Sequence, residues 1–246
     1  MSNSRNNPLV RFKNKRFKVE NGRLELIRMG IRSISEIKGL FSIKKLKRLD
    51  LSENIIPTMD WVDQFQDLEE LDLSHNLIRN IEGLENLRKL KSLDLHSNVI
   101  NKIKGFENLK NLEFINLCYN CIDKIKGLDN LIKLEILILS GNYYTDITNI
   151  KNLQNLRHLH LHDSLLTKIP KLNYFPNLEL LGLNRSHLNK IDSLKNAKDL
   201  CLFINDTPLA KKIVREYGAK INKDGELLNI EEVLNKIGKK KLILNK

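Results

Sequence analysis

The residues best suited to chemistry are histidines that alternate along one short segment. His158 and His160 would project from the same face of a strand, where two imidazoles can reach a single zinc ion. A closed zinc site needs further ligands, and only Asp163 follows nearby. The neighbouring segments offer Ile136, Ile138, Leu180 and Gly182 instead. We therefore favour a polar strand that recognises a partner, and expect no bound metal.

Two cysteines form a second candidate site. Cys118 and Cys121 have the C-x-x-C spacing of a redox-active or zinc-binding pair. Asn120 between them, however, belongs to a column of polar residues that recurs along the chain, and Ser74 and Leu77 fill the cysteine positions in another copy. The repeat alone thus explains the pair.

Sequence motifs for catalysis are missing. The sequence has no nucleophile elbow, no phosphate-binding glycine loop and no paired catalytic carboxylates. Its clustered acidic residues fall on what we expect to be an open sheet, which would not exclude water as a catalytic pocket must. We expect a protein that is not an enzyme and that uses no cofactor. The remaining enzymatic alternative is a metal-dependent site at His158, His160 and Asp163.

Composition places the chain among globular proteins. Its 246 residues are 41% hydrophobic and 29% charged, which excludes disordered and membrane-embedded classes. Three cysteines argue against a disulfide framework and for a reducing compartment. The first residues, MSNSRNNPLVRFKNKRFK, contain no apolar run, so we expect no secretory signal. These features predict a cytoplasmic protein, or a nuclear one if the source is a eukaryote.

The net charge of +12 is concentrated at the two ends of the chain. Residues 1–23 hold seven Lys/Arg and one acid, and residues 211–246 hold ten Lys/Arg and five acids. The middle is nearly neutral, whereas a groove that binds duplex DNA or RNA needs its positive charge on one face. The basic ends predict weak, non-specific binding of nucleic acid or other anions.

A repeat of 22 residues organises the chain. Leucines recur at this step at 24, 46, 68, 90, 112, 134, 156 and 178. One copy, from Leu68 to Lys89, reads LEELDLSHNLIRNIEGLENLRK. Its seven apolar positions stay apolar through all eight copies, with Tyr144 and Ala197 as the weakest members. The pattern predicts an uninterrupted register from Leu24 to Asp199.

The sequence of each repeat predicts a strand on one edge and a tight turn on the other. Apolar and polar residues alternate over 71–73, which is typical of a half-buried strand, and apolar residues then recur every three positions over 78–87, which is typical of a 3₁₀-like turn. Neither edge can bury its apolar side alone, so the repeats must stack into one continuous core. Between the edges runs a polar column that can satisfy buried backbone groups: Arg32, Asn54, Asn76, Asn98, Asn120, Asn142, Ser164 and Ser186.

The pattern LxxLxLxxNxIxxIxxLxxLxx resembles the leucine-rich repeat in its 22-residue subclass. That subclass occurs in a regulatory subunit of protein phosphatase one, in the spliceosomal U-two A-prime protein and in bacterial internalins. The resemblance covers about three-quarters of the chain. It implies an α/β solenoid, or horseshoe, with short parallel strands on the concave face, 3₁₀ or short helical turns on the convex face, and protein binding in the concavity.

Both ends of such a stack need a cap. Asn21-Gly22 predicts the turn of a capping β-hairpin, preceded by a disordered stub of about ten residues. At the other end, we expect a partial ninth strand over 200–204, a helix from Pro208 to about Tyr217 that stops at Gly218, and a second helix after Asn229 that stops at Gly238. The predicted division is a basic segment with hairpin (1–23), eight repeats (24–199), and a partial repeat with helical cap and basic tail (200–246).

The concave face is the predicted binding surface. Its acidic zone is a row of Asp50, Asp72 and Asp94, although aspartate could simply be common at this position in the family. Its apolar zone comprises Phe114, Tyr119, Ile136, Ile138, Leu180, Leu202 and Ile204 unless the C-terminal segment covers it. We expect a partner to contact Asp50, Glu70, Asp72, Asp94, His96, Phe114, Tyr119, Ile136, Ile138, His158, His160, His162, Leu180 and Arg185.

The leading functional hypothesis is an interaction scaffold or regulatory subunit, monomeric by itself, that binds a partner protein in the concavity. That partner would carry a basic element and an apolar anchor. The alternative is a ribonucleoprotein component that binds an RNA-associated protein, with the basic ends keeping RNA close.

Overall fold

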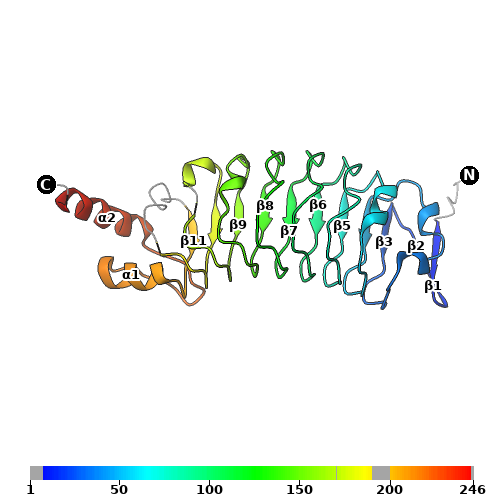
Figure 1. The fold of residues 1–246 in the computed structure, drawn as a ribbon, viewed down its shortest axis with the longest axis horizontal. Coiled ribbons are helices and arrows are strands. Elements are labelled where there is room, and N and C mark those ends of the chain that lie inside the picture. Colours follow the sequence, from blue (N-terminus) through cyan, green and yellow to red (C-terminus); the bar gives the residue numbers. More distant parts are fainter. Residues whose placement is uncertain (1–7, 170, 190–199, 245–246) are drawn as a thin grey trace, which may run out of the picture.

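The computed structural model describes residues 8–169, 171–189 and 200–244. These residues form an elongated solenoid in which short strands stand side by side along its length (Figure 1). Nine parallel strands make one continuous sheet in chain order, which confirms the predicted architecture. They are β3 Arg23–Glu25, β4 Arg48–Asp50, β5 Glu70–Asp72, β6 Ser92–Asp94, β7 Phe114–Asn116, β8 Ile136–Ile138, β9 His158–His160, β10 Leu180–Gly182 and β11 Cys201–Phe203.

Each strand has three residues and buries the middle one. Leu71 of β5, for example, pairs with Leu49 on one side and Leu93 on the other, and all three are at most 1% exposed. A strand this short is not stable alone, so its conformation depends on both neighbours and on the single apolar core that runs through all repeats. The residues that flank the buried one face the concave side.

The convex edge consists of tight turns. Short 3₁₀ helices are η1 Ile34–Glu36, η2 Leu40–Ser42, η3 Asp60–Gln64, η4 Thr148–Ile150 and η5 Leu172–Tyr174. Between η3 and η4 the described edge has turns in place of complete 3₁₀ helices. The three-residue contact persists there, since the Leu87 N–H donates to the Leu84 carbonyl at 3.0 Å. The spacing of three therefore positions apolar side chains even where no helix forms.

The asparagine column holds the two edges together. The Asn98 side-chain nitrogen donates to the carbonyls of Leu73, Leu95 and His96 at 2.9–3.3 Å, and its Oδ1 accepts from the Ile78 N–H at 2.9 Å. One buried amide thus satisfies backbone groups of two successive repeats. The same arrangement recurs at Asn54, Asn76, Asn120 and Asn142.

Hydroxyl residues continue the column less completely. Ser164 donates only to the Leu161 carbonyl at 2.8 Å, and the buried Ser186 Oγ has no hydrogen-bond partner in the described part of the chain. Thr207 is the eighth member, because its Oγ1 donates to the Ile204 carbonyl at the same 2.8 Å. Serine and threonine carry one hydroxyl where asparagine carries an amide with two donors and an acceptor, so fewer column hydrogen bonds form toward the C-terminal end.

The predicted register is wrong at the first repeat. Leu24 of β3 pairs with Leu49, a step of 25, so the first repeat is three residues longer than the 22-residue repeats that follow it. Leu24 and Leu26 are therefore the buried strand residues, whereas Ile27 is 38% exposed. Because convex apolar residues recur every three positions, a three-residue shift still matched the sequence pattern.

The polar column also begins later than predicted. Arg32 is exposed and lies outside the column. The corresponding position, 25 residues before Asn54, is Met29, whose N–H donates to Asn54 Oδ1 at 3.0 Å. The first repeat thus relies on the second for this contact.

The register fails again at the last strand. Leu181 pairs with Leu202, a step of 21. Because a slip of one residue exchanges the two faces of a strand, Leu202 and Ile204 are fully buried, whereas Cys201 and Phe203 face the concave side. The prediction that Leu202 and Ile204 belong to the concave apolar zone is therefore wrong. Three predicted apolar positions of the eighth repeat lie outside the described residues: Ile191, Leu194 and Ala197.

A hairpin covers the N-terminal end, but its turn is not the predicted one. It consists of β1 (Leu9–Phe12) and β2 (Lys15–Lys18), and it buries Val10 and Phe12 against the first repeat. Asn21-Gly22 instead makes a tight turn, with one bridge between Glu20 and Arg23, that leads the chain into β3. Strand structure begins at Leu9, and most of the expected stub of about ten residues lies outside the described residues.

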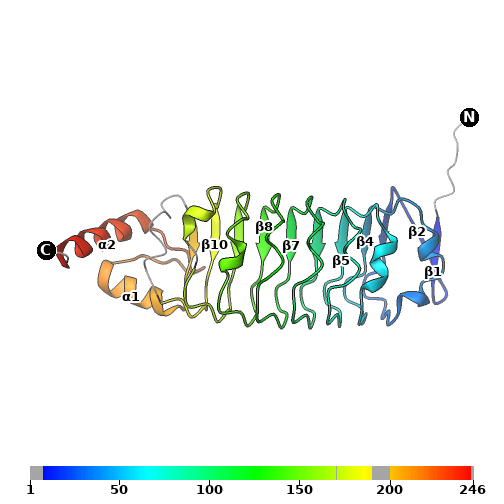
Figure 2. The ribbon, with the colours of Figure 1, turned by 45° about the horizontal axis from the view of Figure 1, so that its top comes forward.

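Two helices lie beyond the last strand (Figures 1 and 2). α1 (Pro208–Tyr217) begins at its N-cap Thr207 and ends at Gly218, whose φ of 68° is left-handed, as the sequence predicted. α2 (Ile230–Leu244) continues past Gly238, where it was expected to stop. A bridge between Phe203 and Glu226 covers the open edge of β11, which prevents pairing with another chain there.

Candidate functional site

The concave face of the sheet is the candidate site, and its outward side chains form lateral rows. The strand register defines the first row as Arg23, Arg48, Glu70, Ser92, Phe114, Ile136, His158, Leu180 and Cys201. The second row is Glu25, Asp50, Asp72, Asp94, Asn116, Ile138, His160, Gly182 and Phe203. The structure thus places the predicted strand residues together on one face.

A third row follows where each strand turns away. Its residues share a left-handed backbone with φ between 51° and 67°: Arg28, Glu53, His75, Ser97, Tyr119, Gly141, Asp163, Arg185 and Asp206. Four residues of the predicted site lie outside the strands. Tyr119 and Arg185 belong to this row, and His96 and His162 each lie one position before it in their repeats.

The second row begins with four carboxylates. The predicted acids Asp50, Asp72 and Asp94 lie on adjacent strands, and Glu25 extends the row at its N-terminal end. Sequence reasoning missed Glu25 because it assumed a constant step of 22. Carboxylates on adjacent strands repel, so this row does not stabilise the fold through its charges.

Local hydrogen bonds hold these carboxylates in place. Asp72 Oδ1 accepts from the Ser74 N–H at 2.9 Å and from the Ser74 hydroxyl at 2.6 Å. Asp50 accepts from Ser52 in the same way, at 3.0 and 2.7 Å. Burial, followed by the charges of Asp94 and Asp50, raises the pKa of Asp72 above its usual value. This carboxylate is thus one that a cationic partner group would stabilise.

Nearby cations are paired with other acids. Arg48 contacts Glu70 at 2.8 Å in the first row, and Arg28 pairs with Glu53 in the third. The predicted site residue Glu70 is therefore largely neutralised within the protein, whereas no lysine or arginine in the described part of the chain pairs with Asp50, Asp72 or Asp94. The second row carries most of the uncompensated negative charge.

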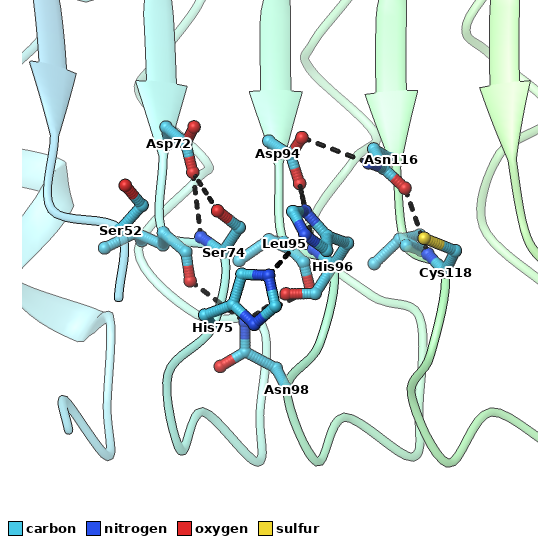
Figure 3. A network of polar contacts seen from close by, with 12 residues as sticks. Ser52, Asp72, Ser74, His75, Asp94, Leu95, His96, Asn98, Asn116 and Cys118 are labelled. Atoms are coloured by element: carbon cyan, nitrogen blue, oxygen red, sulfur yellow. Dashed lines mark hydrogen bonds and ion pairs between the residues drawn. The ribbon is translucent and has the colours of Figure 1, made fainter. Parts of the chain in front are cut away.

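A hydrogen-bond network surrounds Asp94 (Figure 3). Asp94 Oδ1 accepts from His96 Nδ1 at 2.8 Å, and Asn116 donates to Asp94 Oδ2 at 3.1 Å. The Nε2 atoms of His96 and His75 are 2.9 Å apart. Because a carboxylate only accepts, the proton of neutral His96 lies on Nδ1, and its Nε2 then accepts from His75. The predicted residues Asp94 and His96 are thus directly linked, with His75 at the solvent end.

Apolar side chains occupy the centre of the face. Phe114, Ile136 and Ile138 are each half-buried on adjacent strands, and Leu180 is half-buried at the far side of the histidine strand. Tyr119 is 59% exposed, with its ring over Gly141. The helices α1 and α2 lie at the end of the stack and not across these strands (Figure 1). In the described residues, the C-terminal cap therefore leaves the apolar centre open.

The predicted histidine strand lies between the apolar centre and the C-terminal end. His158, His160 and His162 follow one another with ring centroids 6.5 and 5.8 Å apart. His162 Nδ1 accepts from the Asn184 N–H at 3.1 Å and therefore carries no proton. Burial, reinforced by His160, lowers the pKa of His162 to about 4. Burial also lowers the pKa of His160, so the inner part of this strand is uncharged at neutral pH.

Arg185 lies at the C-terminal end of the third row. Its guanidinium contacts both carboxylate oxygens of Asp163 at 2.5 and 2.7 Å. This bidentate pair holds the pKa of Asp163 below its usual range and engages the carboxylate that could have joined a metal site.

The remaining metal and redox candidates do not assemble. Within the described residues, no three side chains among histidine, cysteine, aspartate and glutamate lie close enough to hold a metal ion. Cys118 is half-buried and Cys121 is exposed. Burial and the charge of Asp94 raise the pKa of the Cys118 thiol to about 11, so it is not an activated thiol.

Comparisons with known proteins agree with this geometry. Residues 66–111 match the family model described as leucine-rich repeats in two copies. The structure resembles that of an internalin C2 from Listeria monocytogenes with a TM-score of 0.66 and 28% identity, over 76% of this chain and 80% of that one. The chain is a leucine-rich-repeat protein. No curated protein sequence matches it.

Two further solved structures share the fold of this leucine-rich-repeat protein. An inlF internalin from Listeria monocytogenes matches with a TM-score of 0.60 and 21% identity, over 76% of this chain and 61% of that one. A leucine-rich-repeat protein of Leptospira interrogans matches with a TM-score of 0.60 and 22% identity, over 72% and 53%. This chain thus spans less than two thirds of both proteins. None of its described helices is both long and apolar enough to cross a membrane.

Two concave residues of this leucine-rich-repeat protein were not among the predicted partner contacts. Phe203 contributes an aromatic ring 6.5 Å from that of His162, and Asn184 links β10 to the C-terminal cap through the Asp224 carbonyl at 3.1 Å. Thr207, 21 residues after Ser186, was the signal for the shifted register, because a polar column residue marks the phase of each repeat.

Proposed function

We propose that this leucine-rich-repeat protein is a non-enzymatic scaffold or regulatory subunit that binds a partner protein across its concave face. The observation that carries the proposal is the open apolar centre at Phe114, Ile136 and Ile138. Clustered apolar side chains on an open surface usually mark a protein interface. The fold supports this role, because leucine-rich repeats generally mediate protein–protein interaction.

The zones beside the apolar centre define the partner. Toward the N-terminus lie Asp50, Asp72 and Asp94, which no lysine or arginine of the described chain neutralises. Toward the C-terminus lies the histidine strand, which is largely uncharged at neutral pH. A matching partner presents lysine or arginine toward repeats two to four and an apolar anchor toward repeats five and six. A reducing intracellular compartment suits the three unpaired thiols.

Two matched isoleucines provide the test. Ile138 is half-buried at the centre of the concave face, whereas Ile132 is 57% exposed on the convex side of the preceding repeat. The same Ile→Asp change at each position places a charge on opposite faces. We expect affinity capture from the source cell to recover a partner with the wild type and with Ile132→Asp, but not with Ile138→Asp. Recovery by Ile138→Asp with a normal melting temperature would exclude the concave centre as the binding site.

A further inference from the structure

A second exposed apolar surface runs along one lateral edge of the solenoid. The residue that follows each column position is apolar or weakly polar in six successive repeats. We call this set the edge stripe: Ile55, Leu77, Val99, Cys121, Tyr143 and Leu165. Its five large members are between 36 and 58% exposed, and Cys121 is also exposed. Single exposed apolar residues are ordinary, but an aligned set of six is a contiguous surface.

Backbone hydrogen bonds fix the stripe at regular spacing. The Leu77 N–H donates to the Ile56 carbonyl at 3.0 Å, and the Val99 N–H donates to the Ile78 carbonyl at 3.1 Å. The bonds of Ile55, Cys121 and Tyr143 follow the same pattern. Successive stripe residues are therefore held about as far apart as hydrogen-bonded strands, roughly 4.8 Å.

This spacing selects the kind of segment that fits. An α-helix lying along the stripe presents one residue per turn at about 5.4 Å, so the mismatch over five intervals is only about 3 Å. An extended strand presents same-side residues at about 6.7 Å, and its mismatch over the same length is about 10 Å. A helix can thus contact every repeat, whereas a strand cannot.

The charges beside the stripe define the helix further. Two or three positions after the stripe residues lie the cations Arg79, Lys102, Lys124 and Lys168. Within the described residues, these four form no ion pair. Only two acids share these positions, Asp123 and Asp146, so the flank has a net positive charge. An acidic side chain next to the apolar edge of a bound helix would be stabilised there.

We propose that the edge stripe binds an amphipathic helix of another protein, with one apolar residue per turn along its contact edge and acidic residues beside that edge. The helix lies along the solenoid axis and meets one repeat per turn. The stripe is on a different surface from the concave face, so this inference is independent of the proposed function.

The probe is a fluorescently labelled synthetic peptide of about six helical turns, with leucine once per turn on one edge and glutamate beside it. A control peptide of identical composition distributes the leucines around the helix. Binding to the full chain is measured by fluorescence anisotropy and helix formation by circular dichroism. We expect saturable binding with gain of helicity for the aligned peptide, and at least about ten-fold weaker binding for the control.

Variants assign the binding to the stripe. Val99→Asp places a charge in the middle of the stripe and should weaken binding at least about ten-fold, whereas Ile138→Asp on the concave face should leave it unchanged. Tyr143→Ser is the second variant if Val99→Asp lowers the melting temperature. Equal binding of both peptides, or wild-type binding by a folded stripe variant, would overturn the proposal. A dimer of the free chain that Val99→Asp dissociates would also overturn it, since the occupant would then be a second copy.

Discussion

The imidazole of His162 lies directly over Gly182, so that a β-carbon at position 182 would stand 2.2 Å from His162 Nε2. The backbone of Gly182 has no left-handed conformation, and glycine is needed there for space alone. The glycine thus leaves room for the His162 ring, whose Nδ1 meets the Asn184 N–H. A partner would therefore meet this ring in one fixed, neutral orientation.

Gly182→Ala should displace the His162 ring. The added methyl group meets the far end of the imidazole, which can turn outward, so we expect the protein to remain folded. The ring would lose the Asn184 hydrogen bond and gain water, and its pKa should rise from about 4 toward the ordinary 6.5. NMR titration of the histidine ring signals measures this value. An unchanged pKa would mean that the backbone, and not the ring, had moved.

Stability should fall as the pH is lowered from 6.5 to about 4. The folded protein holds His162 with a depressed pKa, so the unfolded chain binds the proton first and is favoured as the pH falls. Above pH 6.5 this contribution is fully present. Allowing for the partial exposure of the ring, we expect a loss of about 1–2 kcal/mol in the free energy of unfolding. His162→Gln should show a shallower decline in urea unfolding at pH 7, 5.5 and 4, and identical profiles would exclude this role.

Two substitutions in the polar column compare a buried side chain that makes hydrogen bonds with a buried side chain that makes none. Asn98→Ala removes four side-chain contacts and leaves buried backbone groups unpaired, which should cost about 1–3 kcal/mol of unfolding free energy. Ser186→Ala removes a buried hydroxyl without a partner and should be neutral or slightly stabilising. Chemical denaturation measures both. Equal losses for the two variants would contradict the assigned roles of the column.

Asp72→Asn should separate stability from binding. Burial and the neighbouring Asp94 and Asp50 raise the pKa of Asp72, so its charged form costs stability at neutral pH and this cost disappears as the pH falls below the raised pKa. The amide keeps an acceptor for the Ser74 N–H. We expect a gain of about 0.2–1 kcal/mol at pH 7 together with weaker binding of a basic partner. A variant that loses stability and binds normally would favour a purely structural role for the acidic row.

The central repeats could be predicted from sequence because only one register accounts for their buried positions. From β4 to β10 the strand residues recur every 22 positions, and the asparagine column fixes their phase. The ends could not be predicted in the same way. In the first repeat, two registers that differ by three residues both place apolar side chains in the core, at Ile34, Ile37, Leu40 and Ile43. At the other end, residues 200–204 are all apolar, so the sequence does not show which face of that strand is buried.

The site could be predicted only at the level of its rows. Alternation places Asp94, Ile138 and His160 on the concave side, and the structure has them there. The contacts between His75 and His96, and between His162 and Gly182, join different repeats through rotamers that no periodic pattern specifies. They follow from the local space around each side chain.

The distribution of histidines gives the most direct measurement of the central claim that the concave face binds the partner. Five histidines lie on that face, His75, His96, His158, His160 and His162, whereas His187 lies outside it and is exposed. Histidine-selective labelling, followed by mass spectrometry, can compare the free protein with its complex with the captured partner. The account predicts that His75 and His158 lose reactivity in the complex while His187 keeps it. Protection of His187 with unchanged labelling of His75 and His158 would contradict it.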